Sequence, residues 1–140
     1  GEAQMSAKKA QNSNLGERTL QFQLLNADES VRETSAAVKQ NESVTFKAIQ
    51  YSLADLGGEK SKDFTYYIRE VIPEGATDNK DGTYTKDGVK YDGHTETVVV
   101  TVTDNEDGTL SVKYGESDSY TTAIFSNNYS AADNSKADII

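Results

Sequence analysis

The stretch Thr97-Val98-Val99-Val100-Thr101-Val102-Thr103 decides the fold class of this chain. Val98, Val100 and Val102 alternate with threonine and one further valine. A spacing of two puts successive side chains on opposite faces of an extended strand, whereas an amphipathic helix repeats about every 3.6 residues. Valine and threonine also favour strands. The stretch therefore predicts a β-strand with one face in a hydrophobic core.

Other stretches repeat this alternation of apolar and polar residues. They are residues 20–24, 44–48, 64–71, 110–114 and 123–125. Pairs that favour turns, such as Gly57-Gly58, Asp87-Gly88 and Asp107-Gly108, separate them. We therefore predict an all-β domain of about seven to nine short strands, folded as a sandwich of two antiparallel sheets.

Helix is expected to be scarce. Residues 52–56 predict one short helical turn, and the polar residues 29–40 predict a loop or a short helix. Residues 130–140 are small, polar and acidic, which is typical of a linker or tail. The predicted organisation is one domain over residues 1–129, followed by this tail.

The charge balance excludes several functions. The 140 residues contain 23 Asp and Glu against 14 Lys and Arg, for a net charge of -9. Nucleic acids and anionic lipids are bound by basic surfaces, so neither is an expected partner. No apolar run approaches the roughly 20 residues of a membrane span, so no membrane insertion of this segment is expected.

The composition also limits the chemistry. Cysteine is absent, which excludes a disulfide, a thiol nucleophile and a thiolate metal site. His94 is the only histidine, which excludes a zinc site built from several histidines. No cofactor or metal is expected, and no convincing acid–base constellation of an enzyme is visible.

One internal repeat has two interpretations. Residues 77–83 and 103–109 share the pattern Thr-Asp-Asn-x-Asp-Gly-Thr. Clustered Asp and Asn oxygens suit calcium, but Asp-Gly also supplies the positive φ of hairpin turns. Neither segment has the spacing and distal glutamate of an EF-hand loop. The turn interpretation is therefore favoured, and calcium binding stays open.

Three predicted strands each carry one polar residue on an otherwise apolar face. Counting by two gives the series Met5, Ala7, Lys9; Tyr66, Ile68, Glu70; and Ala123, Phe125, Asn127, Tyr129. Taken singly, each polar residue could lie in solvent at a strand end, since charged groups are rarely buried. The same inward parity in three strands makes that interpretation less satisfactory.

In their order and spacing these motifs resemble the isopeptide-forming domains of Gram-positive pilins and cell-wall adhesins, over most of the chain. The matching segments are Met5 to Lys9, residues 20–28, Val44-Thr45-Phe46, Tyr66-x-Ile68-x-Glu70, Tyr91-Asp92 before the valine-rich strand, and Phe125-x-Asn127-x-Tyr129. The chain departs from the family at Ala7, where a bulkier residue is usual. It also departs at residues 92–95, where Asp-Gly-His-Thr replaces an Asp-x-x-Thr-Tyr run, and no function is assigned to His94.

The resemblance implies an Ig-like antiparallel β-sandwich of the collagen-adhesin B type and a self-crosslinking reaction. The Lys9 amine would attack the side-chain amide of Asn127 and release ammonia, with Glu70 as the acid–base group. Burial favours a neutral lysine and a neutral carboxylic acid, as this chemistry requires. Phe22, Phe46, Tyr66 and Phe125 are candidates for the apolar wall. Lys8 and Asn128 are near duplicates of the reactive pair, and a β-bulge would exchange either choice.

The same resemblance implies a structural role. The domain would be a stalk module of a pilin or adhesin, extracellular, on the cell wall or pilus of a Gram-positive bacterium. Its partners would be flanking domains of the same protein or neighbouring pilin subunits. The crosslink forms once per molecule, so the domain would not be an enzyme. The alternative is an adhesin module whose loops bind a host protein or glycan.

Overall fold

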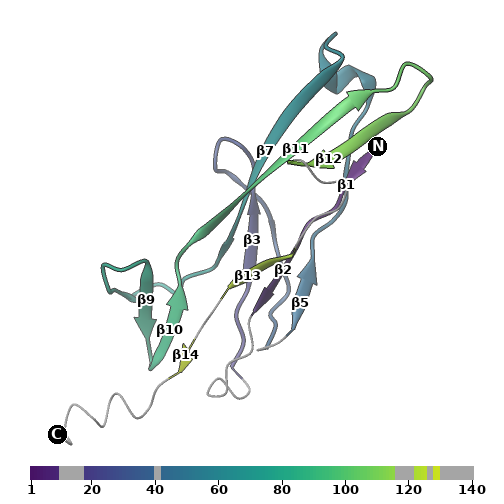
Figure 1. Cartoon of the computed structure of the whole chain (residues 1–140). Helices are drawn as coiled ribbons and strands as arrows, with labels where there is room; N and C mark the ends of the chain where they lie inside the picture. The colour runs from purple at the N-terminus through teal and green to yellow at the C-terminus, as the bar shows by residue number, and fades with distance from the viewer. Residues whose placement is uncertain (10–17, 40–41, 116–121, 126–127, 130–140) are drawn as a thin grey trace, which may run out of the picture.

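The computed structural model describes residues 1–9, 18–39, 42–115, 122–125 and 128–129. Its largest sheet has five strands in the order β12-β11-β7-β3-β4 (Figure 1). These strands are Leu110–Tyr114 (β12), Thr95–Asp104 (β11), Ser61–Glu70 (β7), Phe22–Leu25 (β3) and Val31–Thr34 (β4). All of the pairings within this sheet are antiparallel.

A second layer consists of shorter sheets. One has the order β13-β2-β5 and contains Ala123–Phe125 (β13), Ser6–Lys9 (β2) and Ser43–Thr45 (β5). Beside it, Glu2–Ala3 (β1) pairs with Ile49–Gln50 (β6). Strand β13 runs parallel to β2, whereas β5 runs antiparallel to it. Figure 1 shows β2, β5 and β13 lying together across the lower part of β3.

A third group of strands forms a separate sheet at one end of the molecule. Its order is β14-β10-β9-β8, from Asn128–Tyr129 (β14), Val89–Asp92 (β10), Thr83–Lys86 (β9) and Thr77–Asp78 (β8). Figure 1 shows it at the lower left, beyond the N-terminal end of the long strand β11. Asp87 and Gly88 join β9 to β10 with φ angles of 50° and 82°, as expected for a two-residue hairpin turn.

The hydrophobic core lies between the five-stranded sheet and the shorter sheets. Val98, Val100 and Val102 of β11 are buried in it, as their alternation predicts. The second layer contributes residues such as Met5, Ala7, Phe46, Ala123 and Phe125. The prediction of an all-β sandwich is confirmed. The structure has more strands than the sequence indicated. Four of them, β1, β6, β8 and β14, are only two residues long.

Two expectations about local structure have different outcomes. Residues 53–56 form a short 3-10 helix, η1 (Leu53–Leu56), as predicted. The Ser52 N–H donates to the Asp55 carboxylate at its start (2.7 Å). The expectation of a loop or short helix over residues 29–40 is wrong over Val31–Thr34, which form β4. Strand β4 is an edge strand with mostly exposed side chains, so no buried face imposed an alternating pattern.

The two copies of the repeated Asp/Asn motif form turns of the same construction. Asn79 N–H donates to the Thr83 carbonyl (3.0 Å), and Asn105 N–H donates to the Thr109 carbonyl (3.1 Å). Thr83 and Thr109 each donate from N–H and hydroxyl to the Asp two residues before them. These hydrogen bonds hold the pKa of both aspartates below the usual value. The turn interpretation is confirmed.

The chain passes from one sheet to another at Gly93 and His94. These two residues connect β10 of the four-stranded sheet to β11 of the five-stranded sheet. A Cβ atom on Gly93 would lie 2.6 Å from the Tyr84 ring and 2.8 Å from the Gly82 carbonyl oxygen. The position therefore requires glycine for space. The C-terminal segment makes a similar change of sheet between β13 and β14.

Candidate crosslinking site

Glu70 is the charged residue buried in the core. It is the last residue of β7 and only 2% exposed. Within the described part of the chain, Ser35 is the other buried polar residue. Ser35 has a structural role, since its hydroxyl accepts from the Phe22 N–H (2.9 Å) and donates to the Ala36 carbonyl (2.8 Å). A carboxyl group is costly to bury, so Glu70 is a candidate for a functional role.

An aromatic pair connects Glu70 to the second layer. Glu70 is in register with Phe22 in the β3–β7 pairing. The Phe22 ring meets the Phe125 ring with centroids 5.2 Å apart, and both side chains are completely buried. Phe125 is in turn in register with Lys9 in the parallel pairing of β13 with β2. The backbone positions of Lys9 and Glu70 are thus linked through two packed phenylalanines.

The same register places Lys8 on the outer side of β2. Lys8 lies opposite Ile124, which is 55% exposed, and is itself part-exposed. Ala7 lies opposite Ala123, and both are buried. Along β2, the side chain of Ala7 is therefore buried and that of Lys8 is part-exposed. The sequence had left Lys8 and Lys9 as alternatives, and Lys8 does not share the buried face of Ala7.

Asn127, the third predicted site residue, lies outside the described residues. The chain is described up to Phe125, and its backbone again at Asn128 and Tyr129. Asn128 is in register with Lys90 and Tyr129 with Val89, in the sheet that contains β10. Asn127 therefore follows Phe125 by two residues and immediately precedes the strand that joins the four-stranded sheet.

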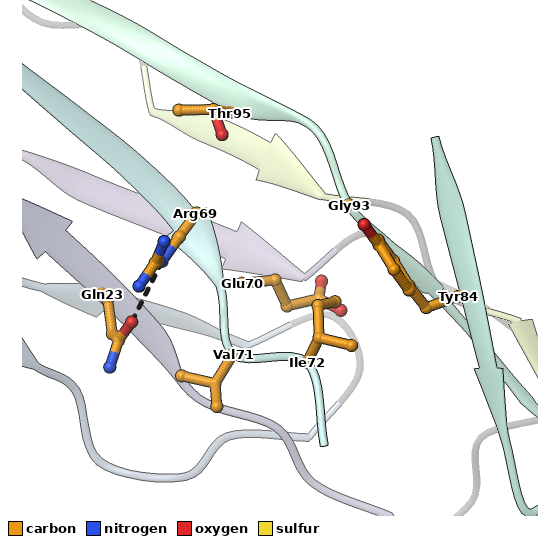
Figure 2. A pocket seen from close by; sticks show the side chains of 8 residues that line it. All are labelled: Gln23, Arg69, Glu70, Val71, Ile72, Tyr84, Gly93 and Thr95. Carbon is orange, nitrogen blue, oxygen red and sulfur yellow. Dashed lines mark hydrogen bonds between the residues drawn. The ribbon is translucent and has the colours of Figure 1, made fainter. Parts of the chain in front are cut away.

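A surface pocket borders Glu70 (Figure 2). It is lined by Gln23, Arg69, Glu70, Val71, Ile72, Tyr84, Gly93 and Thr95. Arg69 Nε donates to Gln23 Oε1 (3.1 Å) on one side of the pocket, and the Tyr84 ring lies beside Gly93 on the other. The pocket brings water close to one side of a carboxyl group that is otherwise in the core.

Tyr91 of β10 is electrostatically coupled to Glu70. Burial raises the pKa of the Tyr91 phenol, and Glu70 raises it further when its carboxyl group is ionised, with a smaller contribution from Asp87. Arg18 opposes this rise. Tyr91 is the tyrosine of the Tyr-Asp segment noted in the sequence, and it is in register with Tyr84. These two tyrosines place the four-stranded sheet next to the Glu70 end of β7.

His94, to which the sequence assigned no function, lies at this site. Its ring stacks on the Phe125 ring, with centroids 4.4 Å apart and an interplanar angle of 18°. Nδ1 lies 2.5 Å from Asp92 Oδ1, and Nε2 lies 2.7 Å from Glu96 Oε2. The spacing Asp92-x-His94-x-Glu96 was the available signal, because a period of two puts all three residues on one side of an extended chain.

The four predicted wall residues separate into two groups. Phe22, Phe46, Tyr66 and Phe125 are all buried, and all belong to the core. Phe22 is in register with Glu70, and Phe125 packs on Phe22, so these two lie at the Glu70 end of the core. Tyr66 is four residues from Glu70 along β7, which is about 13 Å in a strand. Its hydroxyl is hydrogen-bonded to that of Tyr51 (2.7 Å), so it supports the other part of the core.

These features define a structural β-sandwich domain with a buried carboxyl group between its layers. Comparison with protein families agrees with the resemblance seen in the motifs. The model of the family FctA, described as the Spy0128-like isopeptide containing domain, matches residues 4–130. The chain belongs to this family, whose members are structural pilin domains and not a family of catalytic enzymes. The matched range includes Lys9, Glu70 and Asn127.

No curated protein matches the chain. Within the described residues, no helix is both long and apolar enough to cross a membrane. The family and the all-β fold support a pilin or adhesin structural module at the cell surface.

Proposed function

We propose that this domain closes an intramolecular amide bond between Lys9 and Asn127, with Glu70 as the acid–base group. The observation that carries the proposal is the link from Glu70 through Phe22 and Phe125 to Lys9. Glu70 is buried and in register with Phe22, whose ring packs on Phe125, and Phe125 is in register with Lys9. Asn127 follows Phe125 by two residues in the sequence.

The reaction balances without any added reagent. The neutral Lys9 Nζ attacks Asn127 Cγ, and a C–N bond forms. Protonated Glu70 donates a hydrogen bond to the amide oxygen, which becomes negatively charged in the tetrahedral intermediate. A proton from the lysine nitrogen passes by way of Glu70 to the amide Nδ2. The C–Nδ2 bond then breaks, and ammonia leaves.

An apolar surrounding would prepare both groups for this chemistry. Burial disfavours an ammonium ion and a carboxylate, so it favours a nucleophilic amine and a hydrogen-bond-donating acid. Strand β2 ends at Lys9 and pairs with β13, which ends two residues before Asn127, and this pairing would supply a high effective concentration. The domain therefore modifies itself once and does not turn over a substrate.

The proposed bond would carry tension. Strands β2 and β13 run parallel, so pulling back from the start of β2 and forward from the end of β13 shears their hydrogen bonds. A Lys9–Asn127 bond at that end of both strands would pass the force directly from the first segment to the last. The core in between would stay folded under load.

This property suits a stalk domain in a surface fibre. We propose that the domain is extracellular, on the cell wall or pilus of a Gram-positive bacterium. Its proposed partners are flanking domains of the same protein or neighbouring pilin subunits. Single-molecule pulling should show unfolding of K9A and no unfolding of the crosslinked domain at the same force.

Intact-mass measurement of the purified chain tests the crosslink. We expect a mass below that of the sequence by one ammonia. K9A, E70A and N127A should each show their full sequence mass, whereas the matched variants K8A and N128A should still lose ammonia. A full mass in the folded, unmutated chain would overturn the proposal. Peptide mapping of the crosslinked product then identifies the two joined residues.

A further inference from the structure

His94 packs its ring against Phe125, one of the four predicted wall residues. It lies where the chain passes from β10 to β11, and its imidazole stacks on the face of Phe125. Phe22 contacts Phe125 as well, at an interplanar angle of 48°. Phe125 therefore makes ring contacts with residues of two other segments, one before β11 and one in β3. Its own strand, β13, contains only three residues.

The imidazole is itself fixed in place by two carboxylates. Asp92, the last residue of β10, binds Nδ1, and Glu96, near the start of β11, binds Nε2. A carboxylate accepts hydrogen bonds, so both ring nitrogens must carry protons to satisfy both contacts. That form of the ring is the imidazolium cation. A cation stacked on an aromatic face gains an additional electrostatic attraction.

We propose that His94 is a positioning residue for the crosslinking reaction, which clamps Phe125 between its own ring and Phe22 and thereby fixes the strand that leads into Asn127. The inference rests on the proposed Lys9–Asn127 bond. His94 would act through Phe125, on which its ring stacks.

The position of Phe125 explains why such a clamp matters for the rate. Phe125 is in register with Lys9 and precedes Asn127 by two residues. A displacement of about 1 Å between reacting groups can cost about 100-fold in rate. A strand of three residues at the edge of its sheet has few hydrogen bonds with which to resist such a shift. The stack on Phe125 provides a second restraint.

The protonation state of His94 should control the clamp. Burial alone would lower the pKa of His94, but the hydrogen bonds and charges of Asp92 and Glu96 outweigh burial and raise it. Of the strands beside the ring, β10 presents Asp92, β11 presents Glu96 and β13 presents the uncharged Phe125. Arg69 of β7 is in register with Thr95, but its Nε is directed to Gln23. Loss of the His94 proton leaves one ring nitrogen facing a carboxylate without a hydrogen, so one contact must break.

The test follows crosslinking of the full chain over time. The chain is prepared unfolded in denaturant, diluted into buffers between about pH 5 and pH 9, and sampled for the mass of the ammonia-free product. The variants are H94A, which removes the ring, and H94F, which keeps a stacking ring without charge. K8A is the control, because Lys8 lies on the outer side of β2.

We expect H94A to form the product about 10- to 100-fold more slowly than the unmutated chain. In the unmutated chain the rate should fall as His94 loses its proton, and H94F should lack this component. Any fall caused by ionisation of Glu70 should be common to both chains. A ring that serves only to fill space would leave the shape of the pH profile unchanged. Product formation by H94A at the unmutated rate, or the same pH profile in H94F, would overturn the inference.

Two controls separate the possible failures. An unmutated chain that folds without losing ammonia contradicts the proposed crosslink itself, not the clamp. Folding of H94A and H94F is compared in the E70A background, which removes the reaction. If H94A does not fold there, the pH profile of H94F decides. His94 is the only histidine, so its ring proton signals in NMR give its pKa directly, and D92N or E96Q should lower that value.

Discussion

The rings of Phe22 and Phe125 pack with their centroids 5.2 Å apart, and they join the two layers of the sandwich beside a buried glutamate. Phe22 belongs to the five-stranded sheet and Phe125 to the three-stranded sheet. Each is also in register with a residue of the proposed crosslinking reaction, Glu70 for Phe22 and Lys9 for Phe125. The contact between the two layers therefore coincides with the proposed reaction site.

Replacement of Phe125 by alanine should be strongly destabilising. In the K9A background, which cannot crosslink, we expect Phe125→Ala to lower the free energy of unfolding by about 3–5 kcal/mol, because it opens a cavity and removes two ring contacts. Urea unfolding followed by circular dichroism measures this change. Ile124→Ala, at the exposed neighbouring position, should stay within about 0.5 kcal/mol of K9A. Equal effects at the two positions would contradict the packing described for β13.

The crosslink should stabilise the domain without any dependence on redox conditions. Joining Lys9 to Asn127 closes a loop of more than a hundred residues, which by the loop-entropy model corresponds to about 5 kcal/mol. We expect Lys9→Ala to unfold at correspondingly lower urea concentration, whereas Lys8→Ala does not. Added reductant should leave all of these transitions unchanged, since the chain has no cysteine. A transition of the unmutated chain that shifts with reductant would be inconsistent with an amide bond.

His94 should make the stability of the fold depend on pH. Its pKa is raised in the folded state, so its contribution is fully present below the unfolded value of about 6.5 and is lost as pH rises through the folded value. We expect the unfolding free energy of the K9A chain to decrease over this window. The K9A/H94F chain should lack that decrease. Urea unfolding at a series of pH values shows the difference, and parallel curves for the two chains would refute it.

Tyr51 and Tyr66 should behave as a coupled pair. Their hydroxyl groups share a buried hydrogen bond of 2.7 Å, and burial and this contact raise the pKa of Tyr51. Tyr51→Phe or Tyr66→Phe should each cost about 1–3 kcal/mol, because each leaves one buried hydroxyl without that partner. The double variant should cost clearly less than the sum of the two. A double-mutant cycle in the K9A background measures this coupling, and strict additivity would show that the bond contributes nothing.

Much of the sandwich could be predicted from the sequence, because burial of one face imposes a spacing of two on a strand. Val98, Val100 and Val102 are buried as their alternation indicated. Strand β4 was missed because its residues are mostly exposed and no core face shaped their pattern. The parallel pairing of β2 with β13 was also not predictable from local pattern, since it joins segments far apart in the chain.

The candidate site was only partly predictable for the same reason. The parity of Glu70 indicated a buried carboxyl group, and the structure confirms its burial. The sequence named Phe22 and Phe125 among four wall candidates, but it could not show that these two pack on each other and are in register with Glu70 and Lys9. No function was assigned to His94, and its side chain is 37% exposed. Its contact with Phe125 arises only when the chain changes sheets beside β13.

Because β13 pairs with β2 from the other end of the chain, the order of synthesis limits when the proposed bond can form. Ser6 of β2 and Thr122 before β13 share a hydrogen bond of 2.8 Å across 116 positions of the chain. Strand β5 can cover one edge of β2 early, but the other edge stays open until residues 123–125 have been made. A chain in which residues 123–125 have not yet been made therefore cannot close the proposed bond near Lys9. The proposed bond would then be present only in molecules in which β13 has been made and has paired with β2.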